Sequence, residues 1–210
     1  MHLTLSNIKR VYSLLKQQAQ KFYADGQYTH AWSTMCDAVS LIQEFNWEYT
    51  DDDLEQLLQQ LSAQWLPNVP NDYAGDDNRV VVLDDWCTTY VLVMQYIDAL
   101  VAAGKEILYI TSKDIDNCKY KHIIPIISKY PKLTYCVLPR NKQPIDAWCQ
   151  TIYQKVIDFR PSKVITHITS SSVFLLVISR FPQGLTTYRS NLDDQCFWLG
   201  RSVIDYSLEF

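Results

Sequence analysis

The spacing of apolar residues divides the chain into a helical first part and a second part in which strands and helices alternate. In residues 7–24, apolar side chains recur every three or four positions, which is the spacing of one helix face. These side chains are Ile8, Val11, Leu15, Ala19 and Phe22. The stripe stops at Asp25-Gly26-Gln27, where the glycine suits the end of a helix.

Two further helical stripes complete residues 1–66. The second runs through Ala31, Met35, Ala38 and Ile42. The third follows the acidic triplet Asp51-Asp52-Asp53, whose carboxylates can cap free N–H groups and complement the helix dipole. We interpret the triplet as a helix start, because a metal site would need further ligands from elsewhere. Residues 1–66 are therefore predicted to be a small all-α region.

Residues 67–78 are predicted to be a linker, because they contain two prolines, Gly75 and many short polar side chains. Beyond the linker, strand and helix patterns alternate over residues 79–210. The expected strands are 80–83, 106–110, 133–138, 163–168 and 185–188, and the expected helices are 90–103, 122–130, 145–159 and 172–181. Such alternation predicts right-handed crossovers and an α/β fold with a Rossmann-like, doubly wound parallel sheet.

The strand of residues 80–83 is expected at the centre of this sheet. Its four consecutive apolar residues do not alternate, which indicates a strand that is buried on both faces. Asp84, Asp85 and Trp86 follow directly. Because ligands of parallel sheets bind at the carboxyl ends of the strands, we expect these residues at a ligand site. The alternative is a solvated carboxylate pair with no chemical role.

Composition excludes several classes of function. A net charge of −4 argues against sequence-independent nucleic-acid binding, which needs clustered lysine and arginine. No apolar run approaches the roughly 18 residues of a membrane span. The first residues lack the layout of a signal peptide, so a cytoplasmic location is expected.

Glycine and cysteine usage limits the cofactors. The chain has five glycines, and their positions allow neither a dinucleotide fingerprint nor a phosphate-binding P-loop. Six scattered cysteines form no Cys-x-x-Cys pair and have no histidine at metal spacing, so reduced thiols are expected. We therefore expect neither a cofactor nor a metal ion.

The last part of the chain carries a resemblance to a known family. The tract Arg189-Ser190-Asn191-Leu192-Asp193-Asp194-Gln195-Cys196-Phe197-Trp198-Leu199-Gly200 precedes Asp205-Tyr206-Ser207-Leu208-Glu209-Phe210. It resembles the end of the N-terminal Rossmann-like domain of bacterial GT-B glycosyltransferases, which carry Asn-Leu-x-Asp-x-x-Phe-Trp-Leu-Gly before Asp-Tyr-Ser-Leu-Glu-Phe. Residues 195–200 are also similar to a tract of the O-GlcNAc transferase family. That family has tetratricopeptide helices before its catalytic region, and residues 26–38 resemble half of such a repeat. A plain helical hairpin is the alternative.

The resemblance implies that the chain is the acceptor-side domain of an enzyme that transfers a sugar from a nucleotide sugar to a hydroxyl group. The acceptor would be a glycan or a protein in bacterial polysaccharide or glycoprotein assembly. In GT-B enzymes a C-terminal domain holds most of the donor. The chain is thus expected to be part of a longer protein and to be inactive by itself.

Candidate site residues follow from the strand ends and from the resemblance. Asp84 or Asp85 is the expected catalytic base, because the loop after the first strand, residues 84–89, lacks the histidine that the O-GlcNAc transferase family carries there, and Gln195 cannot take up a proton. His167 is a second candidate, with a structural histidine as the alternative. The expected substrate-binding residues are Trp86, Ser170, Arg189, Asn191, Asp194 and Gln195. A competing interpretation is a non-catalytic scaffold whose helical hairpin binds a protein partner.

Overall fold

The computed structural model describes residues 4–67, 72–85, 90–113, 123–191 and 196–209. In this part of the chain, six strands form one sheet in the order β3-β2-β1-β4-β5-β6, and every neighbouring pair is parallel. The strands are β1 Asp76–Asp84, β2 Glu106–Thr111, β3 Leu133–Val137, β4 Pro161–His167, β5 Thr186–Asn191 and β6 Tyr206–Glu209. The predicted α/β class with a parallel sheet is confirmed, and the strand order is consistent with a Rossmann-like fold.

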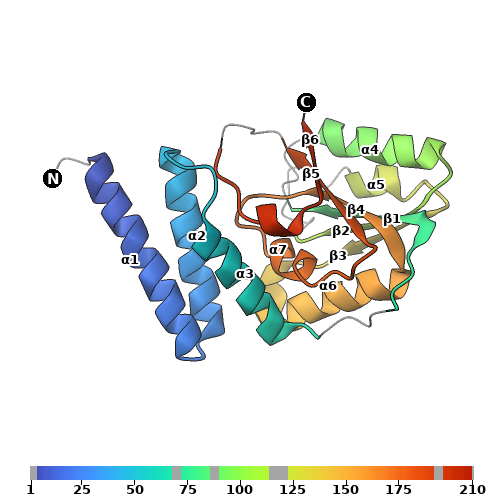
Figure 1. The fold of residues 1–210 in the computed structure, drawn as a ribbon. Helices are drawn as coiled ribbons and strands as arrows, with labels where there is room; N and C mark the ends of the chain where they lie inside the picture. The colour runs from blue at the N-terminus through green and yellow to red at the C-terminus, as the bar shows by residue number, and fades with distance from the viewer. Residues whose placement is uncertain (1–3, 68–71, 86–89, 114–122, 192–195, 210) are drawn as a thin grey trace.

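Helices cover both faces of the sheet (Figure 1). One face packs against α4 (Tyr90–Ala102) and α5 (Ile123–Ile127), and its buried cluster includes Val82 and Tyr109. The other face packs against α6 (Ile145–Phe159) and α7 (Phe174–Ile178), and its cluster includes Val81 and Leu83. Successive residues of β1 therefore belong to different cores, as the two-residue period of a strand requires.

The first part of the chain forms three helices, which are α1 (Leu5–Ala24), α2 (Tyr28–Phe45) and α3 (Asp52–Trp65). α1 and α2 lie side by side at one end of the molecule, and α3 lies between them and the α6–α7 side of the sheet (Figure 1). One continuous buried cluster includes residues of all three helices together with residues of β1, α6 and α7. The helical region and the sheet thus share a hydrophobic core.

A buried carboxylate joins α3 to the last part of the chain. Glu55 is 6% exposed, and its oxygens accept hydrogen bonds from the backbone N–H groups of Gly200, Arg201 and Ser202 at 2.7, 3.1 and 3.1 Å. The Ser202 hydroxyl donates a fourth bond at 2.6 Å. These donors belong to the short 3-10 helix η3 (Arg201–Val203) and the residue before it, so Glu55 fixes this segment against α3.

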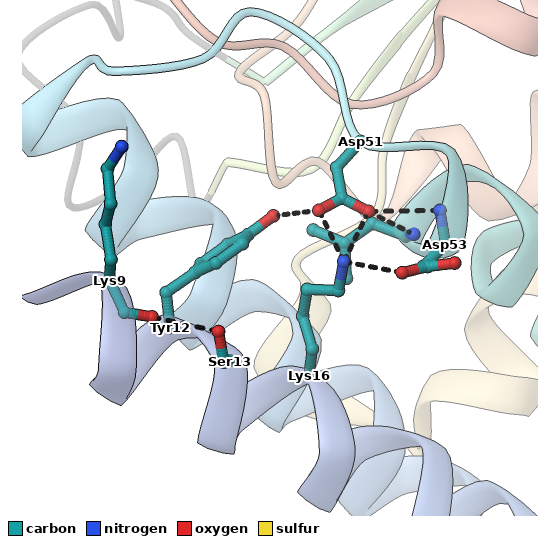
Figure 2. A network of polar contacts seen from close by, with 7 residues as sticks. Lys9, Tyr12, Ser13, Lys16, Asp51 and Asp53 are labelled. Atoms are coloured by element: carbon teal, nitrogen blue, oxygen red, sulfur yellow. Dashed lines mark hydrogen bonds and ion pairs between the residues drawn. The ribbon is translucent and has the colours of Figure 1, made fainter.

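A second polar cluster joins α1 to the start of α3 (Figure 2). Asp51 is the N-cap of α3 and accepts from the backbone N–H groups of Asp53 and Leu54, which confirms the predicted helix start. The same carboxylate accepts from the Tyr12 hydroxyl at 2.5 Å and pairs with Lys16 at 2.6 Å. The lysine also contacts Asp53 at 2.7 Å. The pKa of Asp51 is lowered because the hydrogen bonds and charge of its partners outweigh the opposing effect of burial.

The beginning of the first strand is anchored by specific contacts. At Gly75, just before β1, an added Cβ atom would lie 2.5 Å from the carbonyl oxygen of Pro161, so only glycine fits this approach to β4. Near the start of the strand, Arg79 donates to Glu106 of β2 at 3.0 Å and to the carbonyl of Phe159 at 3.2 Å. These contacts fix β1 against both of its neighbours.

Several elements differ from the sequence prediction, among them α5, which covers only residues 123–127 of the predicted helix 122–130. β1 begins at Asp76, inside the segment expected to be a linker, because its first residues are polar and exposed yet pair with the start of β4. β6 was not expected, since it is a four-residue edge strand with little apolar character. α7 covers only residues 174–178 of the predicted helix 172–181. The likeness of the hairpin of α1 and α2 to a tetratricopeptide repeat stays a prediction.

Candidate functional site

The strand order places β1 and β4 at the point where the chain direction across the sheet reverses. From β1 the sheet continues through β2 and β3 on one side and through β4, β5 and β6 on the other. In open parallel sheets this point opens a crevice at the carboxyl ends of the strands, where ligands bind. Asp84 and His167, the last residues of β1 and β4, lie in register with each other at this point.

The structure brings these two predicted residues into direct contact. Nδ1 of His167 lies 3.0 Å from Oδ1 of Asp84, and the two side chains are each 1% exposed. The hydroxyl group of Tyr109, on β2, donates to Oδ2 of Asp84 at 2.6 Å. The three residues lie on adjacent strands and on the α4 face of the sheet. A solvated carboxylate is thereby excluded for Asp84.

The adjacent carboxylate has different surroundings. Asp85 is 7% exposed, its N–H donates to the carbonyl of His167 at 3.1 Å, and its Oδ1 accepts from the N–H of Thr169 at 2.9 Å. Burial is the main cause that raises the pKa of Asp85 to about 6, and the nearby charge of Asp84 adds to it. Hydrogen bonds from Ser172 and Thr169 act in the opposite direction. Asp85 is thus a buried acid that titrates close to neutral pH.

The segment after β4 is held by residues of the helical region. The hydroxyl of Ser170, which is 3% exposed, accepts from Nε2 of Gln43 on α2 and donates to the carbonyl of Phe197, both at 3.0 Å. The Cys36 thiol, also on α2, contacts the carbonyl of Ser171 at 3.8 Å. Ser170 therefore bridges α2 and the last part of the chain, next to the site.

The structure also places the candidates on β5. Arg189 is 5% exposed, and its guanidinium carbon lies 4.3 Å from the centre of the Trp198 ring, within the range of a cation–π contact. Asn191 ends β5, where its backbone is in register with Glu209 of β6. Trp86, Asp194 and Gln195 lie outside the described residues, so their predicted roles stay predictions.

Sequence patterns did not indicate two of the residues around this site. Tyr109 lies in a run of apolar residues typical of a buried strand, so its hydroxyl group gave no sign of a polar contact. Gln43 is a polar residue of a surface-like helix pattern and is 127 residues away from its partner Ser170. Only the fold shows that these side chains reach the ends of β1 and β4.

Comparisons with known proteins do not assign the chain to a family. No protein-family model matches the chain, and no curated protein sequence matches it. Within the described residues, no cluster of three His, Cys, Asp or Glu side chains has the arrangement of a metal site. In the same part of the chain, no helix has the length and apolar character needed to cross a membrane.

Proposed function

We propose that this chain is the acceptor-side domain of a GT-B-type glycosyltransferase, which transfers a sugar from a nucleotide sugar to a hydroxyl group. The observation that supports this proposal is the buried Asp84–His167 pair at the switch point of the parallel sheet. The resemblance of the tract that begins at Arg189 agrees with it. The acceptor would be a glycan or a protein, and the donor would be held mainly by a second domain.

In the proposed reaction, His167 and Asp84 act as an acid–base unit. A carboxylate can only accept hydrogen bonds, so its contact with Nδ1 assigns the hydrogen to that nitrogen and leaves Nε2 as the proton acceptor of a neutral ring. Nε2 would remove the proton of the acceptor hydroxyl while that oxygen forms a bond to the anomeric carbon. The bond from this carbon to the donor phosphate breaks, and the nucleotide leaves with the electron pair.

Asp85 supplies a second proton-transfer group in this proposal. Its pKa of about 6 lies near the working pH of an intracellular enzyme, which suits a general acid or base. Ser170, Arg189 and Asn191 remain the proposed contacts to hydroxyl groups of the acceptor. The predicted cytoplasmic location agrees with a nucleotide-sugar donor.

The test is sugar transfer by the complete gene product, with a panel of nucleotide sugars and release of nucleotide as the readout. His167→Ala and Asp84→Asn should each lower kcat at least about 100-fold, because positioned acid–base groups contribute 10²–10⁴-fold to a rate. Gln154→Ala, at an exposed position of α6, is the matched control and should retain full activity. Unchanged kcat in the His167 and Asp84 variants would contradict these roles.

A specific feature also favours the competing function as an interaction module. Leu5, Val11 and Leu14 on α1 are 50%, 46% and 55% exposed, so this helix presents apolar side chains to solvent. Exposed apolar side chains that gather on one element are typical of surfaces that bind other proteins. A complete gene product that neither transfers sugar nor hydrolyses any nucleotide sugar would favour this second function.

A further inference from the structure

Tyr109 places a polar group deep in an otherwise apolar cluster. Its side chain is 0% exposed and packs with Val82 of β1 and with Ile97 and Met94 of α4. The neighbours of the ring would accept phenylalanine equally well, because the ring fills the space. Packing therefore does not explain the hydroxyl group. Burying it costs free energy unless it forms a hydrogen bond.

That hydrogen bond is made to the carboxylate that contacts the histidine. The Tyr109 hydroxyl donates to Oδ2 of Asp84 at 2.6 Å, while Oδ1 of the same carboxylate faces Nδ1 of His167 at 3.0 Å. The two oxygens thus serve different partners, one on β2 and one on β4. With one oxygen fixed by the phenol, the carboxylate cannot rotate without losing a short buried hydrogen bond.

We propose that Tyr109 is a positioning residue of the site: it fixes the Asp84 carboxylate and thereby the tautomer and orientation of the His167 imidazole. The effect on His167 is a property of the folded chain. Its consequence for catalysis rests on the proposed function. The contact on one ring nitrogen determines which nitrogen carries the hydrogen. Removing the Tyr109 hydroxyl therefore alters the tautomer and orientation of the His167 ring, although Tyr109 acts on it only through Asp84.

The chain contains a matched control on the same face of the sheet. Tyr96 of α4 also forms a hydroxyl hydrogen bond, to Oγ of Ser190 on β5 at 3.0 Å. Tyr96→Phe removes one hydroxyl group from the same layer of the protein, as Tyr109→Phe does. It leaves the contacts of the Asp84 carboxylate with Tyr109 and His167 unchanged. A general loss of packing would affect both variants, whereas a positioning role affects His167 only in Tyr109→Phe.

The experiment is ¹⁵N NMR of the histidine side chains in the complete chain, whose nitrogen shifts report which ring nitrogen carries the hydrogen. His167 is assigned by its disappearance in His167→Gln. In the wild-type protein, the neutral ring should show a protonated Nδ1 and an unprotonated Nε2. Tyr109→Phe should shift both nitrogens towards the averaged values of mixed tautomers, while Tyr96→Phe should leave them unchanged.

The results separate this role from its alternatives. Wild-type nitrogen shifts in a folded Tyr109→Phe variant would overturn the proposal, and so would equal changes in the Tyr96→Phe control. If Tyr109→Phe does not fold, the wild-type protein still decides: a hydroxyl proton of Tyr109 protected from exchange supports the contact, and its absence overturns it.

The activity assay then tests the catalytic consequence. Tyr109→Phe should lower kcat about tenfold, the rate equivalent of one hydrogen bond, with little change in KM. Failure of the proposed function would give a different result from failure of the positioning role. Neither the wild-type protein nor any variant would then transfer sugar, yet the His167 nitrogen shifts would still respond to Tyr109→Phe.

Discussion

Asp84 and Asp85 are neighbours in the chain, yet each has its own set of contacts. Asp84 faces the phenol of Tyr109 and the imidazole of His167, whereas Asp85 turns toward the segment between β4 and α7. The difference follows from strand geometry, because successive side chains point in opposite directions. Two identical side chains are thereby given two separate environments, and in that of Asp85 burial is the main cause of a raised pKa.

The raised pKa of Asp85 predicts a pH-dependent stability. The folded carboxyl group has a pKa of about 6 against an ordinary value of 3.8, so the folded state binds the proton more tightly than the unfolded state. Its contribution to stability is therefore complete below about pH 3.8 and is lost as the pH rises through about 6. Asp85→Asn has no such loss, so its free energy of unfolding should rise relative to wild type by about 2 kcal/mol between pH 4 and pH 7.

Urea denaturation at both pH values measures this gain. The matched control is Asp37→Asn, at an exposed carboxyl group of α2, for which the difference from wild type should not change with pH. A constant difference between Asp85→Asn and wild type would show that the carboxyl group is solvated in the folded protein.

At the scale of elements, the contact of α1 with the start of α3 depends on one carboxylate. Asp51 caps α3 and at the same time receives the Tyr12 hydroxyl and the Lys16 ammonium group (Figure 2). Tyr12→Phe should destabilise the protein by about 1–2 kcal/mol, because a hydrogen bond to a charged acceptor is lost at a buried tyrosine. The free energy of unfolding from urea titration at neutral pH measures the effect.

A double-mutant cycle assigns this loss to the pair. In an Asp51→Ala background the cost of Tyr12→Phe should become small, since the acceptor is already absent. Tyr23→Phe is the control on the same helix. Its hydroxyl accepts an exposed hydrogen bond from Gln64 at 3.1 Å, so its removal should cost less than about 0.5 kcal/mol. Equal costs of Tyr12→Phe in both backgrounds would contradict the contact.

For the whole molecule, Glu55 connects the helical region to the segment that carries the family resemblance. The carboxylate accepts four hydrogen bonds from residues 200–202 through its two oxygens. A side-chain amide has only one oxygen and cannot replace it. Glu55→Gln should destabilise the protein by about 2–3 kcal/mol, because its NH₂ group would face N–H donors in a buried site. Calorimetry would register this as a lower unfolding temperature.

Gln59, one turn further along α3, provides the comparison. Its side chain donates one exposed hydrogen bond to the hydroxyl of Ser202 at 2.9 Å, so Gln59→Ala should change stability by less than about 0.5 kcal/mol. A Glu55→Gln variant as stable as Gln59→Ala would mean that the segment 200–202 is held by other contacts.

The sequence allowed the sheet to be predicted because apolar runs and helical stripes alternate after residue 79. It also indicated the polar ends of β1 and β4, since Asp84 directly follows the apolar residues 80–83 and His167 comes two positions after the apolar pair Val164 and Ile165. Contacts between distant segments could not be predicted, because the partners of Gln43, Glu55 and Tyr109 depend on how the elements pack. The sixth strand was missed for a local reason, as Tyr206–Glu209 is short and half polar.

The amino-acid sequence of β1 affects how the register of this strand with β2 and β4 is determined. Residues 80–85 read Val-Val-Val-Leu-Asp-Asp, so a slip by one residue would exchange the two faces and still present aliphatic side chains to both cores and a carboxylate to His167. The residues in the middle of the strand therefore do not distinguish the observed register from one shifted by a single residue. The contacts that distinguish them lie at the beginning of the strand, where the Gly75 backbone abuts Pro161 and Arg79 pairs with Glu106. Two residues outside the candidate site thus select which of the two aspartates contacts His167.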